Sequence, residues 1–277
     1  MDGSHLVDAA ELDPAFRGAL TVRALLSKGP SAVDQTLYLA KRAFTGKKRL
    51  IPIEMVELGP PVPDPDKIIC LGLNYREHAA ELNMDTAAAP PFFAKFRNAL
   101  TGPSSPVILP RASTQIDYEG ELAVVIGRRC KEVSEHDAPG FIAGYTIMND
   151  VSARDLQMLT GQWMMGKTLD TFAPMGPGIA PASGIPDPQH LGITTRVNGV
   201  ALQEGSTGQM IFPVARTVAF LSSLMTLEPG DIISTGTPSG VGFKRNPPVF
   251  LKAGDIVEVE IEKIGVIRNP VLGPEAR

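Results

Sequence analysis

The stretch Asp117–Ile126 constrains the fold of this chain more than any other part of the sequence. It reads Asp-Tyr-Glu-Gly-Glu-Leu-Ala-Val-Val-Ile, and its last five residues are apolar. Three of these are β-branched and Gly127 follows them, so the stretch is predicted to form a strand. Because successive side chains of a strand point to opposite faces, Asp117, Glu119 and Glu121 are predicted to share one face.

Three acids on one face favour either of two environments. Same-face neighbours of a strand lie roughly 7 Å apart, and carboxylates at this spacing raise one another's pKa unless a cation lies between them. Hard divalent ions such as Mg²⁺, Mn²⁺ or Ca²⁺ prefer carboxylate oxygens, whereas zinc and copper prefer the His or Cys ligands that this stretch lacks. The alternative is the solvated face of an edge strand, and the stretch alone leaves both interpretations open.

The composition excludes several classes of protein. A chain of 277 residues with 43% hydrophobic residues can bury a sizeable core. No apolar run approaches the roughly 18 residues that span a bilayer, so we expect no membrane partner. The net charge of -4 and the lack of a Lys/Arg cluster argue against a nucleic-acid partner, whose binding surface is basic. A small-molecule substrate is therefore expected.

The termini and cysteines indicate the compartment. Cys70 and Cys130 both lie in or beside apolar strand-like runs, where buried free thiols are expected rather than a disulfide scaffold. The start Met-Asp-Gly-Ser-His has neither the basic nor the apolar region of a secretory signal. We therefore expect a cytoplasmic location.

A proline-rich stretch divides the chain. Residues 59–66 include four prolines, which favours a stiff, extended and non-helical segment. We predict a small N-terminal α+β domain over residues 1–62, with a helix at Val33–Phe44 and a strand at Leu50–Leu58 that Pro52 interrupts. The larger second domain is predicted over residues 66–273.

The second part of the chain is rich in strands and turns. Asn74 and Glu77 have the spacing of a capping box, which predicts a short helix over residues 75–82. Many strands with occasional helices predict an antiparallel or mixed β architecture with irregular insertions, not a βαβ array. The other clear elements are strands at Lys67–Leu73 and Phe141–Asn149 and a helix at Pro213–Met225.

Several residues become candidates for chemistry once a metal is considered. Asp150 follows a predicted strand and could complete a set of carboxylate ligands with Glu119 and Glu121. His78 and Glu81 lie three residues apart on one helix face, the pairing that a general base needs, although such a pair is also common on a surface. Lys167 is a further candidate. A lone lysine is often solvated, but its positive charge can also bind a carboxylate or stabilise a developing enolate.

Two further features suggest substrate contacts. Arg154 and Gln157 follow Asp150 closely enough to hold a substrate carboxylate, and a solvated helix face fits their spacing equally well. The loop Thr235–Gly242 lacks the Lys-Ser/Thr ending of a phosphate-binding P-loop. Its glycines instead allow a turn that brings backbone N–H groups and the Thr237 hydroxyl to an anion.

Together these segments resemble the fumarylacetoacetate hydrolase family, in its branch of acylpyruvate hydrolases, oxaloacetate decarboxylases and hydroxyheptadienedioate isomerases. The resemblance extends from about Lys67 to Val271. It is specific because the matching motifs occur in the same order, at Gly72–Glu81, Asp117–Gly127, Gly144–Asp155, Gly166–Phe172 and Thr235–Gly242.

The resemblance implies a mainly β fold, a mixed β-sandwich roll with α+β insertions, in a chain that forms a homodimer. It implies that the second domain is a metal-dependent catalytic domain holding Mg²⁺ or Mn²⁺. The residues that match the family's metal ligands are Glu119, Glu121 and Asp150. His78 and Glu81 match its water-activating pair and Lys167 its lysine near the substrate's oxo group; the positions that match its substrate contacts are Arg154, Gln157 and Thr237.

The intact His78–Glu81 pair favours hydrolysis among the family's reactions. The function favoured from the sequence is cleavage of a C–C bond in an acylpyruvate-type 2-oxo acid, with a pyruvate enolate as leaving group. Oxaloacetate decarboxylation and hydroxyheptadienedioate isomerisation are alternatives on the same residues. An alternative of another class is a binding protein that a metal stabilises without turnover. Five residues are candidates for the wall around the acyl group, although each could equally pack in the core. They are Met158, Met164, Met165, Phe92 and Phe172.

Overall fold

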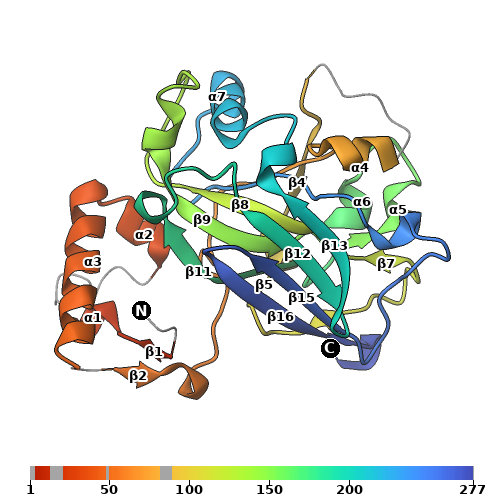
Figure 1. The fold of residues 1–277 in the computed structure, drawn as a ribbon, viewed down its shortest axis with the longest axis horizontal. Coiled ribbons are helices and arrows are strands. Elements are labelled where there is room, and N and C mark those ends of the chain that lie inside the picture. Colours follow the sequence, from red (N-terminus) through yellow and green to blue (C-terminus); the bar gives the residue numbers. More distant parts are fainter. Residues whose placement is uncertain (1–3, 13–20, 48–49, 82–88, 277) are drawn as a thin grey trace.

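Two β-sheets packed face to face form the centre of the structure (Figure 1). The computed structural model describes residues 4–12, 21–47, 50–81 and 89–276. Within these residues no helix has the length and apolar character needed to cross a membrane. The predicted mainly β fold, a mixed β-sandwich roll with helical insertions, is confirmed.

The larger sheet has seven strands, and β8 is its central strand. Adjacent strands of this sheet run antiparallel, with two exceptions: β14 pairs with β3, and β11 with β5, in parallel. In spatial order the strands are β4 (Phe92–Lys95), β3 (Ile68–Leu71), β14 (Ile232–Ser234), β8 (Gly120–Ile126), β9 (Ile142–Asn149), β11 (Ala173–Pro181) and β5 (Leu100–Thr101).

The second sheet has five strands and is antiparallel apart from its last pair. Its strands, in spatial order, are β13 (Val200–Ser206), β12 (Gly192–Val197), β15 (Ile256–Ile261), β16 (Gly265–Leu272) and β6 (Val107–Ile108). Two short antiparallel pairs complete the strands: β7 (Ile116–Asp117) with β10 (Ser152–Ala153), and β1 (His5–Leu6) with β2 (Ile51–Pro52).

Both faces of β8 are buried, so this strand anchors two parts of the core. Leu122, Val124 and Ile126 pack between the two sheets, together with the helix α7 (Val214–Leu224). Ala123 and Val125 pack on the opposite face of the larger sheet. Every residue of β8 is buried, so the alternative of a solvated edge strand is wrong.

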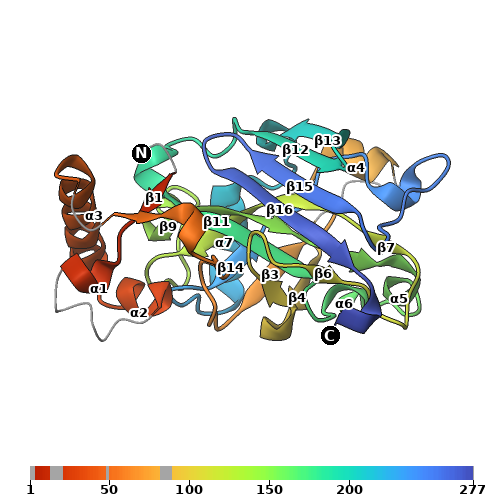
Figure 2. The same ribbon diagram turned by 90° about the horizontal axis from the view of Figure 1, so that it is seen from below.

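Apart from α7, the α-helices lie at the two ends of the sheets (Figure 2). The N-terminal helices α1 (Ala9–Leu12), α2 (Val22–Leu26) and α3 (Pro30–Thr45) lie at one end, and Leu26 packs into the core beneath the larger sheet. The helices that bear predicted site residues lie at the other end: α4 (Arg76–Glu81), α5 (Arg154–Gln157) and α6 (Met164–Lys167). The division into domains over residues 1–62 and 66–273 stays a prediction.

The elements with a clear apolar period match the sequence analysis. The predicted helices Val33–Phe44 and Pro213–Met225 correspond to α3 and α7, and the strand Phe141–Asn149 to β9. Cys70 and Cys130 are buried free thiols, as expected. Of the predicted strand Leu50–Leu58, only Ile51–Pro52 forms a strand; a 3₁₀ turn follows directly.

The predicted strand Asp117–Ile126 is broken in the structure, which is a correction. Strand β7 ends at Asp117 and β8 begins at Gly120. Side chains replace strand pairing in between: the Glu119 amide donates to Asn149 Oδ1 at 3.0 Å, and the Gly120 amide donates to Gln203 Oε1 at 3.0 Å. Tertiary hydrogen bonds thus override the local β propensity at this point.

The predicted capping box at Asn74 and Glu77 is also wrong. The Asn74 amide nitrogen donates to the carbonyls of Phe212 and Thr235 at 3.1 and 2.7 Å, and its oxygen accepts from the Phe212 amide at 2.7 Å. Glu77 accepts from the Gln209 side chain at 2.8 Å. Asn74 is completely buried, so it ties the start of α4 to two distant loops instead of capping the helix.

Gly120 allows the two sheets to approach each other beside Glu119. A Cβ atom at this position would lie 2.3 Å from Thr195 Oγ1 and 2.8 Å from a methyl group of Val259, both in the second sheet. We expect Gly120→Ala to lower the free energy of unfolding by about 1–3 kcal/mol, measured by urea denaturation. Gly192→Ala is the matched control, because a methyl group added there would meet no atom within 4 Å beyond its chain neighbours; equal stability of the two variants would contradict the close approach.

Candidate active site

Three buried carboxylates converge where β8 begins and β9 ends. Glu119 and Glu121 flank Gly120, which pairs with Asn149 at the end of β9, and Asp150 is the next residue. One carboxylate oxygen from each acid lies within 4.8 Å of the others. Antiparallel pairing of two sequence-adjacent strands therefore builds the cluster, and the predicted set of Glu119, Glu121 and Asp150 is brought together.

Two buried lysines compensate the negative charge of this cluster. Lys167 Nζ donates to Glu119 Oε2 at 2.5 Å and to Asp150 Oδ2 at 2.8 Å. Lys95 Nζ bonds the other oxygen of Asp150 and donates to the Val151 carbonyl at 3.0 Å. The Lys95 side chain is completely buried, and the sequence analysis missed it. The available signal was a lysine in the otherwise apolar strand β4, since a lysine is fully buried only when it is paired.

The acids of the cluster differ in their protonation. Burial raises the pKa of Glu121 to about 8, and the charges of Asp150 and Glu119 act in the same direction. Burial also disfavours the charge of Glu119, but Arg154 and Lys167 outweigh it and hold the pKa of Glu119 below its usual range. The Ser234 hydroxyl and the Gly236 amide both donate to Glu121 Oε2, at 2.5 and 2.9 Å.

This donor set fits a hard divalent cation. All three potential ligands are carboxylates, which Mg²⁺, Mn²⁺ and Ca²⁺ prefer. A divalent charge among them would offset both the burial and the repulsion that raise the pKa of Glu121. The cluster can therefore hold a metal ion, with Glu119, Glu121 and Asp150 as its protein ligands.

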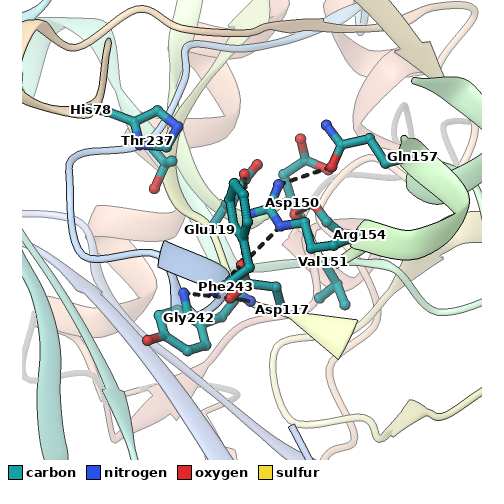
Figure 3. A network of polar contacts seen from close by, with 12 residues as sticks. His78, Asp117, Glu119, Asp150, Val151, Arg154, Gln157, Thr237, Gly242 and Phe243 are labelled. Atoms are coloured by element: carbon teal, nitrogen blue, oxygen red, sulfur yellow. Dashed lines mark hydrogen bonds and ion pairs between the residues drawn. The ribbon is translucent and has the colours of Figure 1, made fainter. Parts of the chain in front are cut away.

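Arg154 connects the cluster to Asp117, as Figure 3 shows. Its Nε donates to Asp117 Oδ2 at 2.8 Å and its Nη1 to Gln157 Oε1 at 3.0 Å. Nη2 lies 2.8 Å from Asp117 Oδ2 and 2.7 Å from Glu119 Oε1, yet no described residue accepts an aligned hydrogen bond from it. These ion-pair contacts fix the guanidinium of Arg154, which also lines the pocket beside Glu119.

Asp117 is therefore not one of the clustered acids, in contrast to the face predicted from the sequence. Its carboxylate accepts from the amides of Gly242 and Phe243, at 2.7 and 3.1 Å, as well as from Arg154. The Phe243 ring in turn lies over the Arg154 guanidinium, 4.3 Å from the ring centroid. The break after β7 thus turns Asp117 away from the cluster and makes it the anchor for Arg154.

His78 and Glu81 form the predicted pair on α4. His78 Nδ1 lies 3.0 Å from Glu81 Oε2, and the Gly240 amide donates to Glu81 Oε1 at 3.1 Å. An ionised carboxylate only accepts hydrogen bonds, so Nδ1 carries the proton and the Nε2 of a neutral ring keeps its lone pair. His78 is 5% exposed and faces the pocket. The pair has the arrangement of an oriented general base.

The loop Thr235–Gly242 binds anions, but these are carboxylates of the protein itself. Its amides at Gly236, Gly240 and Gly242 donate to Glu121, Glu81 and Asp117 respectively. The Thr237 hydroxyl donates to the Gly120 carbonyl at 2.9 Å and accepts from Gln203. The loop thereby connects the acid cluster, the histidine pair and the arginine anchor.

One pocket of about 300 Å³ brings these groups together. The predicted site residues all line it except Glu81, which supports His78 through its Oε2. In the view of Figure 3, His78 and Thr237 lie on one side of Glu119, and Arg154 and Gln157 on the other. The apolar part of the wall consists of Leu71, Leu73, Phe93, Met158, Trp163 and Phe243.

Of the five residues considered for the wall around an acyl group, only Met158 lines the pocket. Phe172 is completely buried in the core, and Phe92 stacks on Phe220 with centroids 6.0 Å apart. Met164 and Met165 are 40% and 42% exposed and do not line the pocket. Strand alternation explains one error, because Phe93 faces the pocket and its neighbour Phe92 faces the core.

Comparisons with known proteins agree with this geometry. The family described as "Fumarylacetoacetate (FAA) hydrolase C-terminal" matches residues 67–272. The chain belongs to the fumarylacetoacetate hydrolase family. It is therefore an enzyme of this family, and the predicted resemblance is confirmed.

Named relatives cover nearly the whole chain. A mitochondrial oxaloacetate tautomerase of Xenopus laevis is 43% identical over 98% of this chain and 84% of its own length. The corresponding protein of Rattus norvegicus is 45% identical over 98% of this chain and 85% of its own length. The crystal structure of 2-hydroxyhepta-2,4-diene-1,7-dioate isomerase from Mycobacterium marinum aligns with a TM-score of 0.72 at 43% identity, over 81% of each chain.

The protonation of Glu121 gives a pH dependence for metal binding. Because the pKa of Glu121 is about 8, this residue must release a proton to become a ligand at lower pH. We expect the affinity for Mg²⁺ to rise as the pH increases to about 8 and then to level off, with close to one proton released per ion at neutral pH. Calorimetry in buffers of different ionisation enthalpy measures this release.

Two variants make this measurement specific. Glu121→Gln should bind Mg²⁺ more weakly and without the proton release. Glu262→Gln, which alters a half-exposed glutamate in the turn between β15 and β16, should behave as the unchanged protein. Proton-free binding of Mg²⁺ by the unchanged protein at neutral pH would show that Glu121 is not a ligand.

Proposed function

We propose that this enzyme transfers a proton at C3 of a 2-oxo acid, interconverting its keto and enol forms, with oxaloacetate as the first candidate substrate. The observation that carries the proposal is that an oriented base, an ammonium group and a three-carboxylate cluster line one pocket. The names of the relatives support this reaction, since two are oxaloacetate tautomerases and one is an isomerase.

The reaction requires charge stabilisation, because removing a proton from C3 leaves negative charge on the 2-oxo oxygen. A divalent cation held by Glu119, Glu121 and Asp150 would supply Lewis-acid polarisation of that oxygen. Lys167, whose pKa the charges of Asp150 and Glu119 raise against the effect of burial, stays protonated and can donate to the same oxygen.

The remaining residues bind the substrate and move the proton. Arg154, whose guanidinium lines the pocket beside Glu119, holds the C1 carboxylate. His78 takes the C3 proton on Nε2 and returns it to the enol oxygen or to C3, while Glu81 fixes the ring and stabilises its charged form. The pair thus serves both directions of the tautomerisation.

Hydrolysis of an acylpyruvate, the reaction favoured from the sequence, is the second candidate. It uses the same His78–Glu81 pair to activate a water that attacks the distal carbonyl, and the bond then breaks to give a pyruvate enolate. Oxaloacetate decarboxylation reaches an enolate without needing the pair. The relatives' names support proton transfer as the first candidate. The noncatalytic alternative is not retained, because the chain is an enzyme of this family.

Other finer predictions are kept as proposals. We propose Mg²⁺ or Mn²⁺ as the ion, because the three ligands are carboxylates. A homodimer and a cytoplasmic location also stay predictions; the vertebrate relatives are named as mitochondrial.

Replacing the base tests the proposed reaction. We expect His78→Ala to lower kcat for oxaloacetate tautomerisation by about 10²-fold or more, because no other residue would accept the C3 proton. The loss of enol absorbance, followed by stopped flow with Mg²⁺ present, measures this rate. His136→Ala is the control, since the His136 side chain is 95% exposed.

A substrate panel separates the candidates. The unchanged protein should tautomerise oxaloacetate faster than it cleaves acylpyruvates or releases carbon dioxide. Cleavage of acylpyruvates that exceeds tautomerisation would favour the hydrolase instead. Full tautomerase activity in His78→Ala would eliminate the assigned base.

A further inference from the structure

One cation at the pocket has no role in the mechanism above. Lys244 lines the pocket together with Arg154 and Lys167. Arg154 is paired with Asp117, and Lys167 contacts two carboxylates of the cluster. The Lys244 side chain makes no ion pair or hydrogen bond with the part of the chain that the structure describes; its Nζ lies 5.4 Å from the centroid of the Phe243 ring.

The backbone of Lys244 is held firmly although its side chain is exposed. Lys244 ends the 3₁₀ turn Gly242–Lys244. The two preceding amides, of Gly242 and Phe243, donate to Asp117, the buried carboxylate that also accepts from Arg154. The base of the Lys244 side chain is therefore fixed relative to the arginine that we assign to the C1 carboxylate.

The charges around the pocket limit how many substrate carboxylates it can neutralise. Once a divalent cation is bound, its charge and those of Lys95 and Lys167 exceed the charges of the three carboxylates by one. Arg154 does not add to this excess because Asp117 balances it. The metal-bound cluster can therefore neutralise at most one substrate carboxylate, and a second one needs another cation.

The neighbouring arginine cannot supply that charge as readily. Arg245 Nη2 donates to the Leu202 carbonyl and Nε to the Gly240 carbonyl, and Arg245 does not line the pocket. Phe243 lies beside Lys244, and Met158 and Trp163 are among the other apolar residues of the pocket wall. A carboxylate placed against such a wall without a cation would lose hydration without compensation.

We propose that Lys244 binds the distal carboxylate of the substrate and so selects 2-oxo dicarboxylic acids over 2-oxo monocarboxylic acids. This inference rests on the proposed function, in which the 2-oxo acid end binds at Arg154 and the acid cluster. Lys244 acts at the pocket entrance as a specificity-determining residue and takes no part in the proton transfer.

Two ligands that differ only in the distal group test the proposal. Oxaloacetate carries a second carboxylate where 2-oxobutanoate carries a methyl group. We expect Lys244→Gln to weaken the binding of oxaloacetate about two- to fivefold, the range for a solvent-exposed ion pair, and to leave the binding of 2-oxobutanoate unchanged. Calorimetry with Mg²⁺ present measures both dissociation constants without any need for turnover.

Kinetics and control variants complete the test. In the tautomerase assay Lys244→Gln should raise KM for oxaloacetate while kcat is retained, and Lys244→Arg should restore KM. Lys252→Gln removes an exposed lysine that does not line the pocket, so it should change neither ligand's affinity. Added salt should reduce the preference of the unchanged protein for oxaloacetate, because an exposed pair is screened.

The outcomes separate this inference from the proposed function. If Lys244→Gln weakens the binding of both ligands equally, or of neither, Lys244 does not recognise the distal carboxylate. If the calorimetric difference is found but the unchanged protein does not tautomerise oxaloacetate, the binding role of Lys244 stands and the proposed reaction is wrong.

Discussion

The repulsion among three buried carboxylates is the constraint on which the rest of this structure depends. Glu119, Glu121 and Asp150 lie within a few ångströms of one another in the core, where water cannot screen their charges. Lys95 and Lys167, which are themselves buried, offset this repulsion by forming ion pairs with the cluster. Buried ion pairs of this kind contribute little net stability. Their presence is better explained by the site that they maintain.

Backbone geometry decides where these charges meet. Glu119 precedes β8 and Asp150 follows β9, so one antiparallel pairing brings them together. The break after Asp117 separates a third acid from the cluster and assigns it to Arg154 and the loop at Gly242. The same few residues therefore define a cluster that can take a metal ion and an arginine that can take a carboxylate.

The sequence predicted those features that local patterns encode. The apolar periods of α3, α7 and β9 and the acids beside Gly120 are local patterns, and their elements and the acid cluster were predicted. Features set by contacts distant in sequence were missed. Lys95 is 55 residues from Asp150, and Asn74 bonds residues 138 and 161 positions away. No local spacing reveals such partners, so Lys95 was not identified and Asn74 was assigned to a helix cap.

The shared site residues cannot by themselves determine which reaction the enzyme favours. Tautomerisation, acylpyruvate hydrolysis and decarboxylation all pass through an enolate, so each benefits equally from the carboxylate cluster and Lys167. They differ in what must lie next to His78: a C3 proton for tautomerisation, or a water for hydrolysis. The pocket of about 300 Å³ is lined by His78 together with apolar residues such as Leu73 and Phe243. In the proposed function, the substrate takes the place of water in this pocket and C3 lies next to His78, and this arrangement would favour proton transfer over hydrolysis.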